Sequence, residues 1–284
     1  MIIRQSLPSF KSGFARSAGE SANPSLWKGL VGAWVPALGV TGVTTLRDVS
    51  GNGNHGTMNG SMTIDDWVAG ERGYALDFDG SSDYVDIANP DKFAPHDDNW
   101  TFVSRFKTSV AANGRIVSAI NTAGGEWLQL VVVTTTGVLQ FSADDGSDPN
   151  TIMSSSFAVN DGKWHQSVVQ RNSFTDTWRL WIDGAIADAV TNSGETSIDS
   201  IDELLIGAVW GSGGANVTPK RLFFAGQISE VRIYNRKLQD SEIAYDYANF
   251  LAPFQLKPLT ISLPAAAPPA GGGNAGRLTL LGVG

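Results

Sequence analysis

The sequence contains no cysteine, few charged residues and no long apolar segment, and each absence excludes a class of protein. Without cysteine, the 284-residue chain has neither a disulfide framework nor a thiol nucleophile. No apolar run approaches the length of about 18 residues that a membrane-spanning helix needs, so we expect no transmembrane segment. A net charge of −8 and a pI near 4.8 argue against a nucleic-acid-binding protein.

Histidine is also scarce, and His55, His96 and His165 are far apart in the sequence. The chain has no H-E-x-x-H metal motif and no G-x-S-x-G nucleophile motif. Residues 51–56 and 271–276 both fit G-x-G-x-x-G, but neither lies between a strand and a helix, as a nucleotide-binding loop must. These absences predict a protein that is not an enzyme.

Glycine and tryptophan are abundant, with 32 and 9 residues, which is typical of an all-β protein with tight turns and aromatic core anchors. Alternating apolar segments predict strands at 30–34, 75–78, 84–87, 100–107, 115–120, 126–133, 138–143, 204–209 and 228–234. An Asp-Gly turn predicts that 75–78 and 84–87 form a hairpin. A second hairpin is predicted within 161–184, and a helix within 240–250.

Four motifs then identify a family resemblance. The segment at 226–243 has the pattern G-x-I-x-E-V-R-I-Y-N-R-x-L-x-x-x-E-I, which resembles the C-terminal signature of laminin-G-like (concanavalin A-like) jelly-roll domains. The runs D-x-S-G-N-G-N-H-G-T at 48–57, A-L-x-F-D-G-x-x-D-Y-V at 75–85 and W-H-x-x-V-V…L-x-x-D-G at 164–184 match the same family in order. The resemblance implies an antiparallel β-sandwich (jelly roll) with a short C-terminal helix.

Charge is distributed unevenly along the chain and predicts three parts. We expect an N-terminal arm at 1–28, a jelly-roll domain at 29–251, and a Pro/Ala/Gly-rich C-terminal arm at 252–284, both arms being extended. The arms carry net charges of +3 and +2, whereas the domain has 14 basic and 27 acidic residues, a net −13. Basic arms are attracted to acidic neighbours, which favours a homo-oligomeric assembly.

The leading hypothesis for function is a structural protein of a phage particle. Basic residues interrupt each apolar run after Met1, so we expect no signal peptide. The segments SAGES…LWKGLVGAW and NFLAPFQ resemble small laminin-G-like proteins in the structural gene sets of tailed bacteriophages. That resemblance implies a non-enzymatic virion protein (capsid decoration, head spike or tail-associated subunit), assembled in the host cytoplasm. Both arms would bind other virion subunits, and the jelly roll would adhere to host-surface glycans.

The alternative hypothesis is a carbohydrate-binding, lectin-like module outside a virion, which the same resemblance implies. Trp67, Trp127 and Trp210 lie in or near predicted loops and are candidates to stack on sugar rings. Glycosidases that share this fold typically carry an E-x-D-x-x-E run for acid and nucleophile, and this sequence has none.

No cofactor is required by either hypothesis, but calcium is an option. Asp48, Ser50 and Asn52 alternate and are followed by Gly53, like the first half of a calcium loop. Asn59 stands where such a loop has its distal acid, and an Asx-stabilised turn is the alternative interpretation. The acidic turns at 79–83 and 144–148 leave the same two interpretations open.

Overall fold

A computed structural model describes residues 20, 23–38, 44–96, 98–122, 125–145, 151–191, 198–210 and 220–254. Most of the two predicted arms, part of the acidic turn at 144–148 and most of the loop after Trp210 lie outside these residues. Within the described ranges, no helix has the length and apolar character needed to cross a bilayer.

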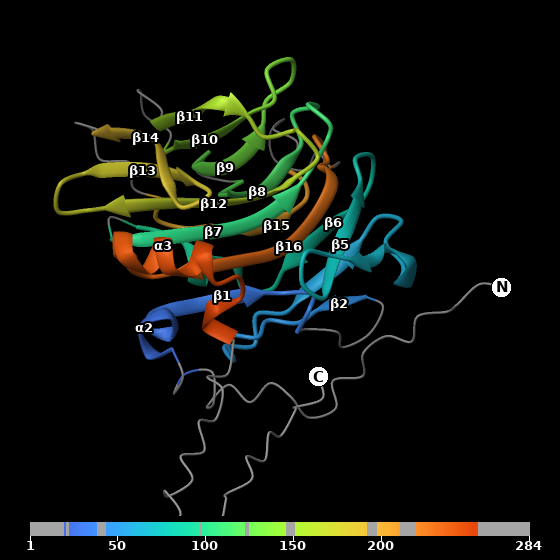
Figure 1. The fold of residues 1–284 in the computed structure, drawn as a ribbon, viewed down its shortest axis with the longest axis horizontal. Helices are drawn as coiled ribbons and strands as arrows, with labels where there is room; N and C mark the ends of the chain where they lie inside the picture. Colours follow the sequence, from blue (N-terminus) through green and yellow to red (C-terminus); the bar gives the residue numbers. More distant parts are fainter. Residues whose placement is uncertain are drawn as a thin grey trace, which may run out of the picture.

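The described chain is an antiparallel sandwich of two eight-stranded sheets, which confirms the predicted jelly roll (Figure 1). Sheet A contains, in spatial order, β14 (Ala185–Thr191), β13 (Thr177–Ile182), β12 (Trp164–Asn172), β7 (Trp100–Lys107), β16 (Ala225–Tyr234), β5 (Tyr74–Asp79) and β4 (Trp67–Ala69), with β1 (Leu30–Trp34) also paired to β16. Sheet B contains β11 (Thr151–Ala158), β10 (Val138–Asp144), β9 (Trp127–Val132), β8 (Arg115–Ile120), β15 (Glu203–Ile206), β6 (Tyr84–Ile87), β3 (Gly56–Asn59) and β2 (Thr45–Leu46). The helices are α2 (Pro24–Trp27) and α3 (Asp240–Ala248), with short 3-10 turns η1 (Ile64–Asp66), η2 (Pro90–Phe93) and η3 (Ala252–Phe254).

Of the two predicted hairpins, one is confirmed and one is wrong. Strands β12 and β13 pair directly, as expected. Strands β5 and β6 do not pair, because β5 lies in sheet A and β6 in sheet B. The turn between them therefore carries the chain across the sandwich. The Asp79 carboxylate closes this turn by accepting hydrogen bonds from the backbone N–H groups of Ser81, Ser82 and Asp83 at 2.8, 2.8 and 3.0 Å.

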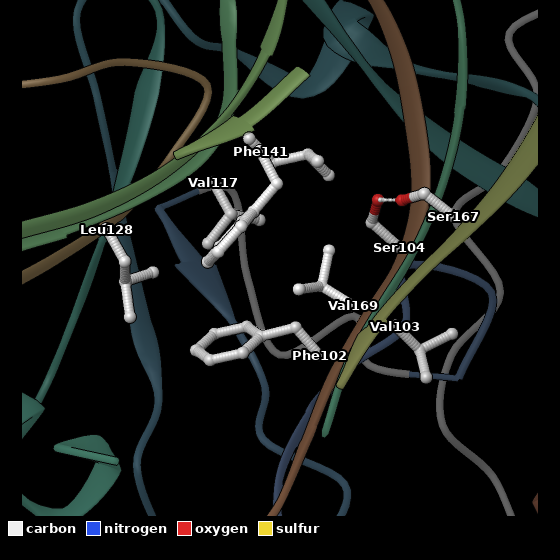
Figure 2. Close-up of a pocket in the computed structure, with 9 residues that line it drawn as sticks. Phe102, Val103, Ser104, Val117, Leu128, Phe141, Ser167 and Val169 are labelled. Carbon is white, nitrogen blue, oxygen red and sulfur yellow. Dashed lines mark hydrogen bonds between the residues drawn. The ribbon is translucent and has the colours of Figure 1, made fainter. Parts of the chain in front are cut away.

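The main hydrophobic core fills the space between the sheets. It includes an aromatic group in which the Trp100 ring centroid lies 5.2 Å from that of Trp178 and 5.1 Å from that of Phe102. Figure 2 shows the one polar pair beside a small void in this core, where the hydroxyls of Ser104 and Ser167 hydrogen-bond to each other at 2.6 Å. The void measures about 10 Å³, at the lower limit for one water molecule, so it is a packing gap and not a ligand site.

A second apolar cluster covers the outer face of sheet A. Figure 1 shows α3 lying against this face. Trp27 of α2 packs edge-on against Phe254 of η3, with ring centroids 5.6 Å apart, and its indole N–H donates to the Pro253 carbonyl at 2.6 Å. The packed body therefore begins by Asn23 and continues to Phe254. This extends the expected domain, 29–251, by a few residues at each end.

Between α3 and sheet A lies a buried layer of charged side chains. Ile243, Ala244, Tyr247 and Phe250 fall at helical spacing in the sequence, which favours one apolar face. In the structure Ala244 and Tyr247 are exposed, and the buried positions are Ile243, Asp246 and Phe250. Asp246 is buried because it pairs with Arg232 of β16, which is fully buried. The guanidinium of Arg232 also lies 2.6 Å from a Glu230 carboxylate oxygen and donates to the Tyr234 hydroxyl at 2.8 Å. In addition, Gln166 of β12 donates to Asp246 at 2.9 Å.

This layer makes stability depend on pH. Burial, together with the charge of Asp246, raises the pKa of the Glu230 carboxyl to about 7, although Arg232 and Arg105 oppose the shift. Because this pKa is higher in the folded state, the contribution of Glu230 to stability is complete below about pH 4.5 and is lost as the pH rises through about 7.

We expect Glu230→Gln to become more stable relative to the wild type as the pH rises from 5 to 8. The relative gain should exceed about 1.4 kcal/mol, the value of one pKa unit. Urea unfolding at several pH values measures it. Asp240→Asn, at the exposed start of α3, is the matched control and should show no such trend. Parallel pH curves for Glu230→Gln and the wild type would contradict the assignment.

Candidate functional site

The outer face of sheet B carries a row of polar side chains in register. Gln129 of β9 is paired with Ser118 of β8 on one side and with Ser142 of β10 on the other. The neighbouring residues Val117 and Leu128 belong to the core, so the alternation of side chains in a strand places the polar row on the opposite face. Gln129 donates to the Ser142 hydroxyl at 3.1 Å. Ser118 and Ser142 are buried, whereas Gln129 is partly exposed, so this face offers one amide group of the kind that hydrogen-bonds sugars.

Residues 208–210 and 220–222 lie over one part of this face. Val209 forms a bridge with Arg221, and Ser118 donates to the Ala208 carbonyl at 2.7 Å. A pocket of about 230 Å³ lies between these residues and strands β8 and β9, and we name it the β8–β9 pocket. Its lining is Arg115, Ala119, Ile120, Trp127, Leu128, Gln129, Val209, Trp210, Arg221 and Leu222. The volume is slightly below the range of about 300–1,000 Å³ for small-molecule sites, so it accommodates part of a larger ligand.

Two of the three predicted glycan-binding tryptophans, Trp127 and Trp210, line this pocket, and both are partly exposed. The Lys220 ammonium lies 3.8 Å from the centre of the Trp210 ring and also pairs with Glu203, so it holds that ring from one face. The third candidate, Trp67, is not available to stack on a sugar ring. Trp67 begins β4, is 5% exposed and belongs to the core, so its ring cannot stack on a ligand.

One end of the pocket is positively charged. The Arg115 guanidinium donates to the Gln129 side-chain oxygen at 2.9 Å and to the Asn113 carbonyl at 2.6 Å. Burial lowers the pKa of Arg115 to about 10, and the like charge of Arg221 contributes to this shift. Within the lining given above, which comprises described residues only, there is no carboxylate.

The predicted calcium residues form a turn that is attached to β1. One Asp48 oxygen accepts from the backbone N–H groups of Ala33 at 3.0 Å and Ser50 at 2.9 Å, and the other accepts from that of Asn54 at 3.0 Å. The Asn52 amide donates to the Val31 carbonyl at 2.9 Å. Among the described residues, no group of three or more His, Asp or Glu side chains is arranged to hold a metal ion. This geometry supports the Asx-turn interpretation of the 48–53 loop.

We expect Asp48→Asn to lower the free energy of unfolding by about 1–2 kcal/mol, because one of its oxygen acceptors for buried backbone N–H groups becomes an amide donor. A chelator should leave the melting temperature of the wild type unchanged, and millimolar calcium should not raise it. Thermal unfolding with and without EDTA measures both effects. A melting temperature that rises with calcium in the wild type, but not in Asp48→Asn, would contradict the turn interpretation.

The other acidic and histidine candidates also have structural partners. Partial burial raises the pKa of Asp79, but hydrogen bonds from Ser82, Ser81 and Asp83 outweigh it, and the net pKa of Asp79 is lowered. His165 is 7% exposed, and its ring nitrogens lie 2.7 Å from Asp183 and 3.1 Å from Asp161. Hydrogen bonding to Asp183 raises the pKa of His165 despite its burial. These contacts stabilise turns next to strands and form no shared site with the tryptophans.

The sequence did not identify Arg115, Gln129 and Arg221 as site residues. Alternation within the strands at 115–120 and 126–133 separates the outer face from the core. However, it does not show that residues 208–210 and 220–222 lie over that face, because this depends on a contact between distant parts of the chain.

Comparison with known proteins identifies the family and the fold of this chain. The profile of a laminin-G family, described as the concanavalin A-like lectin/glucanases superfamily, matches residues 79–244. No curated protein sequence matches the chain.

Three similar solved structures show the same fold at low sequence identity. The binding domain of Paraclostridial Mosquitocidal Protein 1 has a TM-score of 0.61 at 14% identity, over 78% of this chain and 52% of that one. A structure of botulinum neurotoxin type C, described as dependent on two ganglioside molecules for cell entry, has a TM-score of 0.60 at 13% identity, over 80% and 52%. Domain 4 of an extracellular arabinanase from Geobacillus stearothermophilus, in complex with arabinotriose, has a TM-score of 0.57 at 17% identity, over 77% and 98%. The chain thus spans about half the length of the two toxin structures.

Proposed function

Because this chain belongs to the concanavalin A-like lectin/glucanases superfamily, we propose that it is a carbohydrate-binding module whose ligand occupies the β8–β9 pocket. The observation that carries the proposal is the convergence of Trp127 and Trp210 on one pocket that also contains the Gln129 amide. Aromatic faces beside fixed hydrogen-bonding groups suit a sugar ring, which has apolar faces and a polar edge.

The similar structures support this proposal. One of them holds arabinotriose, and another is described as interacting with gangliosides, which carry glycans. Both are under 25% identical to this chain, so the ligand of this protein has to be inferred from its own pocket.

We also propose that the module is not an enzyme. Glycoside hydrolysis generally requires two carboxyl groups that flank the scissile bond. The described lining of the β8–β9 pocket has none, and its charged groups, Arg115 and Arg221, are cations that do not serve as general acid or base near neutral pH.

A glycan array probed with the full chain tests the binding proposal. We expect a defined subset of glycans to bind, and free ligand to compete. Titration should quench the fluorescence of partly exposed tryptophans, because Trp127 and Trp210 line the pocket. An absence of binding to any glycan on a broad array would overturn the proposal.

Incorporation into a phage particle is a second proposal, and it rests on the charge distribution. The net charges of +3 and +2 in the predicted arms, against −13 for the body, favour contacts between arms and bodies of neighbouring subunits. Truncations should remove residues 1–22 and 255–284 only, because residues 23–28 and 252–254 contain parts of the packed body. Each truncation should reduce incorporation into particles and self-association in solution. If both truncated chains assemble like the full chain, this proposal is overturned.

A further inference from the structure

We propose that the β8–β9 pocket selects an anionic sugar, and that Arg115 and Arg221 bind its carboxylate or sulfate group. This inference rests on the proposed carbohydrate-binding function and specifies the class of glycan. It is carried by the placement of two guanidinium groups at one end of a pocket whose other walls are aromatic and amide side chains.

Arg115 is fixed in position before a ligand arrives. Its Nε donates to Gln129 and one of its terminal nitrogens donates to the Asn113 carbonyl, so two hydrogen bonds orient the guanidinium. No described residue accepts a hydrogen bond from its other terminal nitrogen. A guanidinium held in this way loses little side-chain entropy when this terminal nitrogen donates a charge-assisted hydrogen bond to an anionic oxygen.

Charge favours an anion at this end of the pocket. Arg221 is close enough to Arg115 for their repulsion to affect the titration of Arg115. An anion between two like charges relieves their repulsion, and partial burial strengthens the attraction compared with bulk water. The overall charge of −8 would otherwise repel an acidic glycan, so these two cations provide the local positive charge that such a ligand needs.

The positions of the cations and the tryptophan also predict how the ligand lies. Arg115 is paired with Val131, four residues from Trp127 on the same strand, so their backbones are separated by about 13 Å. The opposite end carries less positive charge, because Asp144 is the cross-strand partner of Trp127, and Glu203, which is paired with Ile120, balances the charge of Lys220. The acidic group of the ligand should therefore lie near Arg115, with a neighbouring sugar ring stacked on Trp127.

Titration calorimetry with matched probes tests the inference. The probes are lactose against sialyllactose and a neutral against a sulfated chitooligosaccharide, so that the carboxylate and sulfate sources are measured separately. We expect at least one anionic probe to bind 10-fold or more tightly than its neutral match, and the preference to fall as salt is raised from 50 to 500 mM. Arg221→Gln should reduce the preference at least 5-fold, and Arg221→Lys should retain part of it. Arg72→Gln, at an exposed arginine outside the pocket, is the matched control.

The outcomes separate this inference from the proposed function. If the neutral probes bind as well as the anionic ones, or if Arg221→Gln keeps the full preference, the anionic selection is overturned while carbohydrate binding stands. If no glycan binds, the proposed function fails and the inference fails with it. Arg115→Gln provides a second measurement at the other cation, and circular dichroism establishes that each variant is folded.

Discussion

Replacing Arg232 with methionine is expected to lower the free energy of unfolding by about 3–5 kcal/mol. Arg232 is fully buried and pairs with both Glu230 and Asp246. Its removal leaves two carboxylates facing each other beneath α3, away from water. Chemical denaturation at pH 7 measures the loss. Arg179→Met is the matched control: its ion pair with Asp240 is partly exposed and 3.4 Å long, so its removal should cost less than about 1 kcal/mol.

A triple substitution separates two quantities. One is the destabilisation caused by removing a single partner from the charged layer, and the other is the net contribution of all three charged side chains to the free energy of unfolding. Replacing Glu230, Arg232 and Asp246 together by apolar side chains of similar volume leaves no buried charge unpaired among the three. Such a replacement is expected to be far less destabilising than Arg232→Met, and can even stabilise a protein. If the triple variant is as unstable as the single one, the loss comes from packing, and our electrostatic explanation is wrong.

Replacing Trp127 with alanine is expected to weaken glycan binding at least tenfold, or about 1.4 kcal/mol. Trp127 lines the β8–β9 pocket and is the aromatic side chain that β9 contributes to it. Large aromatic side chains at the centre of a binding site often contribute more than other contacts do. Trp127→Phe, which keeps a smaller ring, should lose less affinity. Calorimetry with the best array ligand measures each variant.

Two controls make this result specific. Phe174 is 93% exposed in the turn between β12 and β13, so Phe174→Ala removes an exposed aromatic ring outside the pocket and should leave affinity unchanged. Trp67→Phe should also leave affinity unchanged, because Trp67 is buried in the core. Full affinity in a folded Trp127→Ala variant would place the glycan elsewhere on the molecule.

Much of the secondary structure could be predicted from local patterns. The strand at 100–107 matches β7, and the strands at 115–120 and 30–34 match β8 and β1. Alternation of apolar side chains marks such strands because one side of each faces the core. Strands β11 and β14 at the edges were not predicted, since edge strands such as β14, with its largely exposed or half-buried side chains, carry a weaker apolar pattern.

The assignment of strands to sheets could not be predicted locally. The D-G turn after Asp79 indicates a reversal of the chain equally well for a hairpin and for a crossing between two sheets. The outcome depends on the strands with which β5 and β6 pair. Strand β5 pairs with β4 and β16, whereas β6 pairs with β3 and β15. Similarly, the helical spacing of Ile243 and Phe250 marks the buried side of α3, but only Arg232 beneath the helix explains why Asp246 lies between them.

The sequence by itself determined the all-β sandwich, the short C-terminal helix and two of the tryptophans in the candidate site, because these depend on alternation, turn residues and family motifs within short segments. Tertiary structure alone decided that Trp67 is buried while Trp127 and Trp210 share a pocket, and that Arg115 and Arg221 meet at its end. These residues lie on segments up to about a hundred positions apart. Their proximity follows from sheet pairing and from the packing of one segment over another, which no local pattern records.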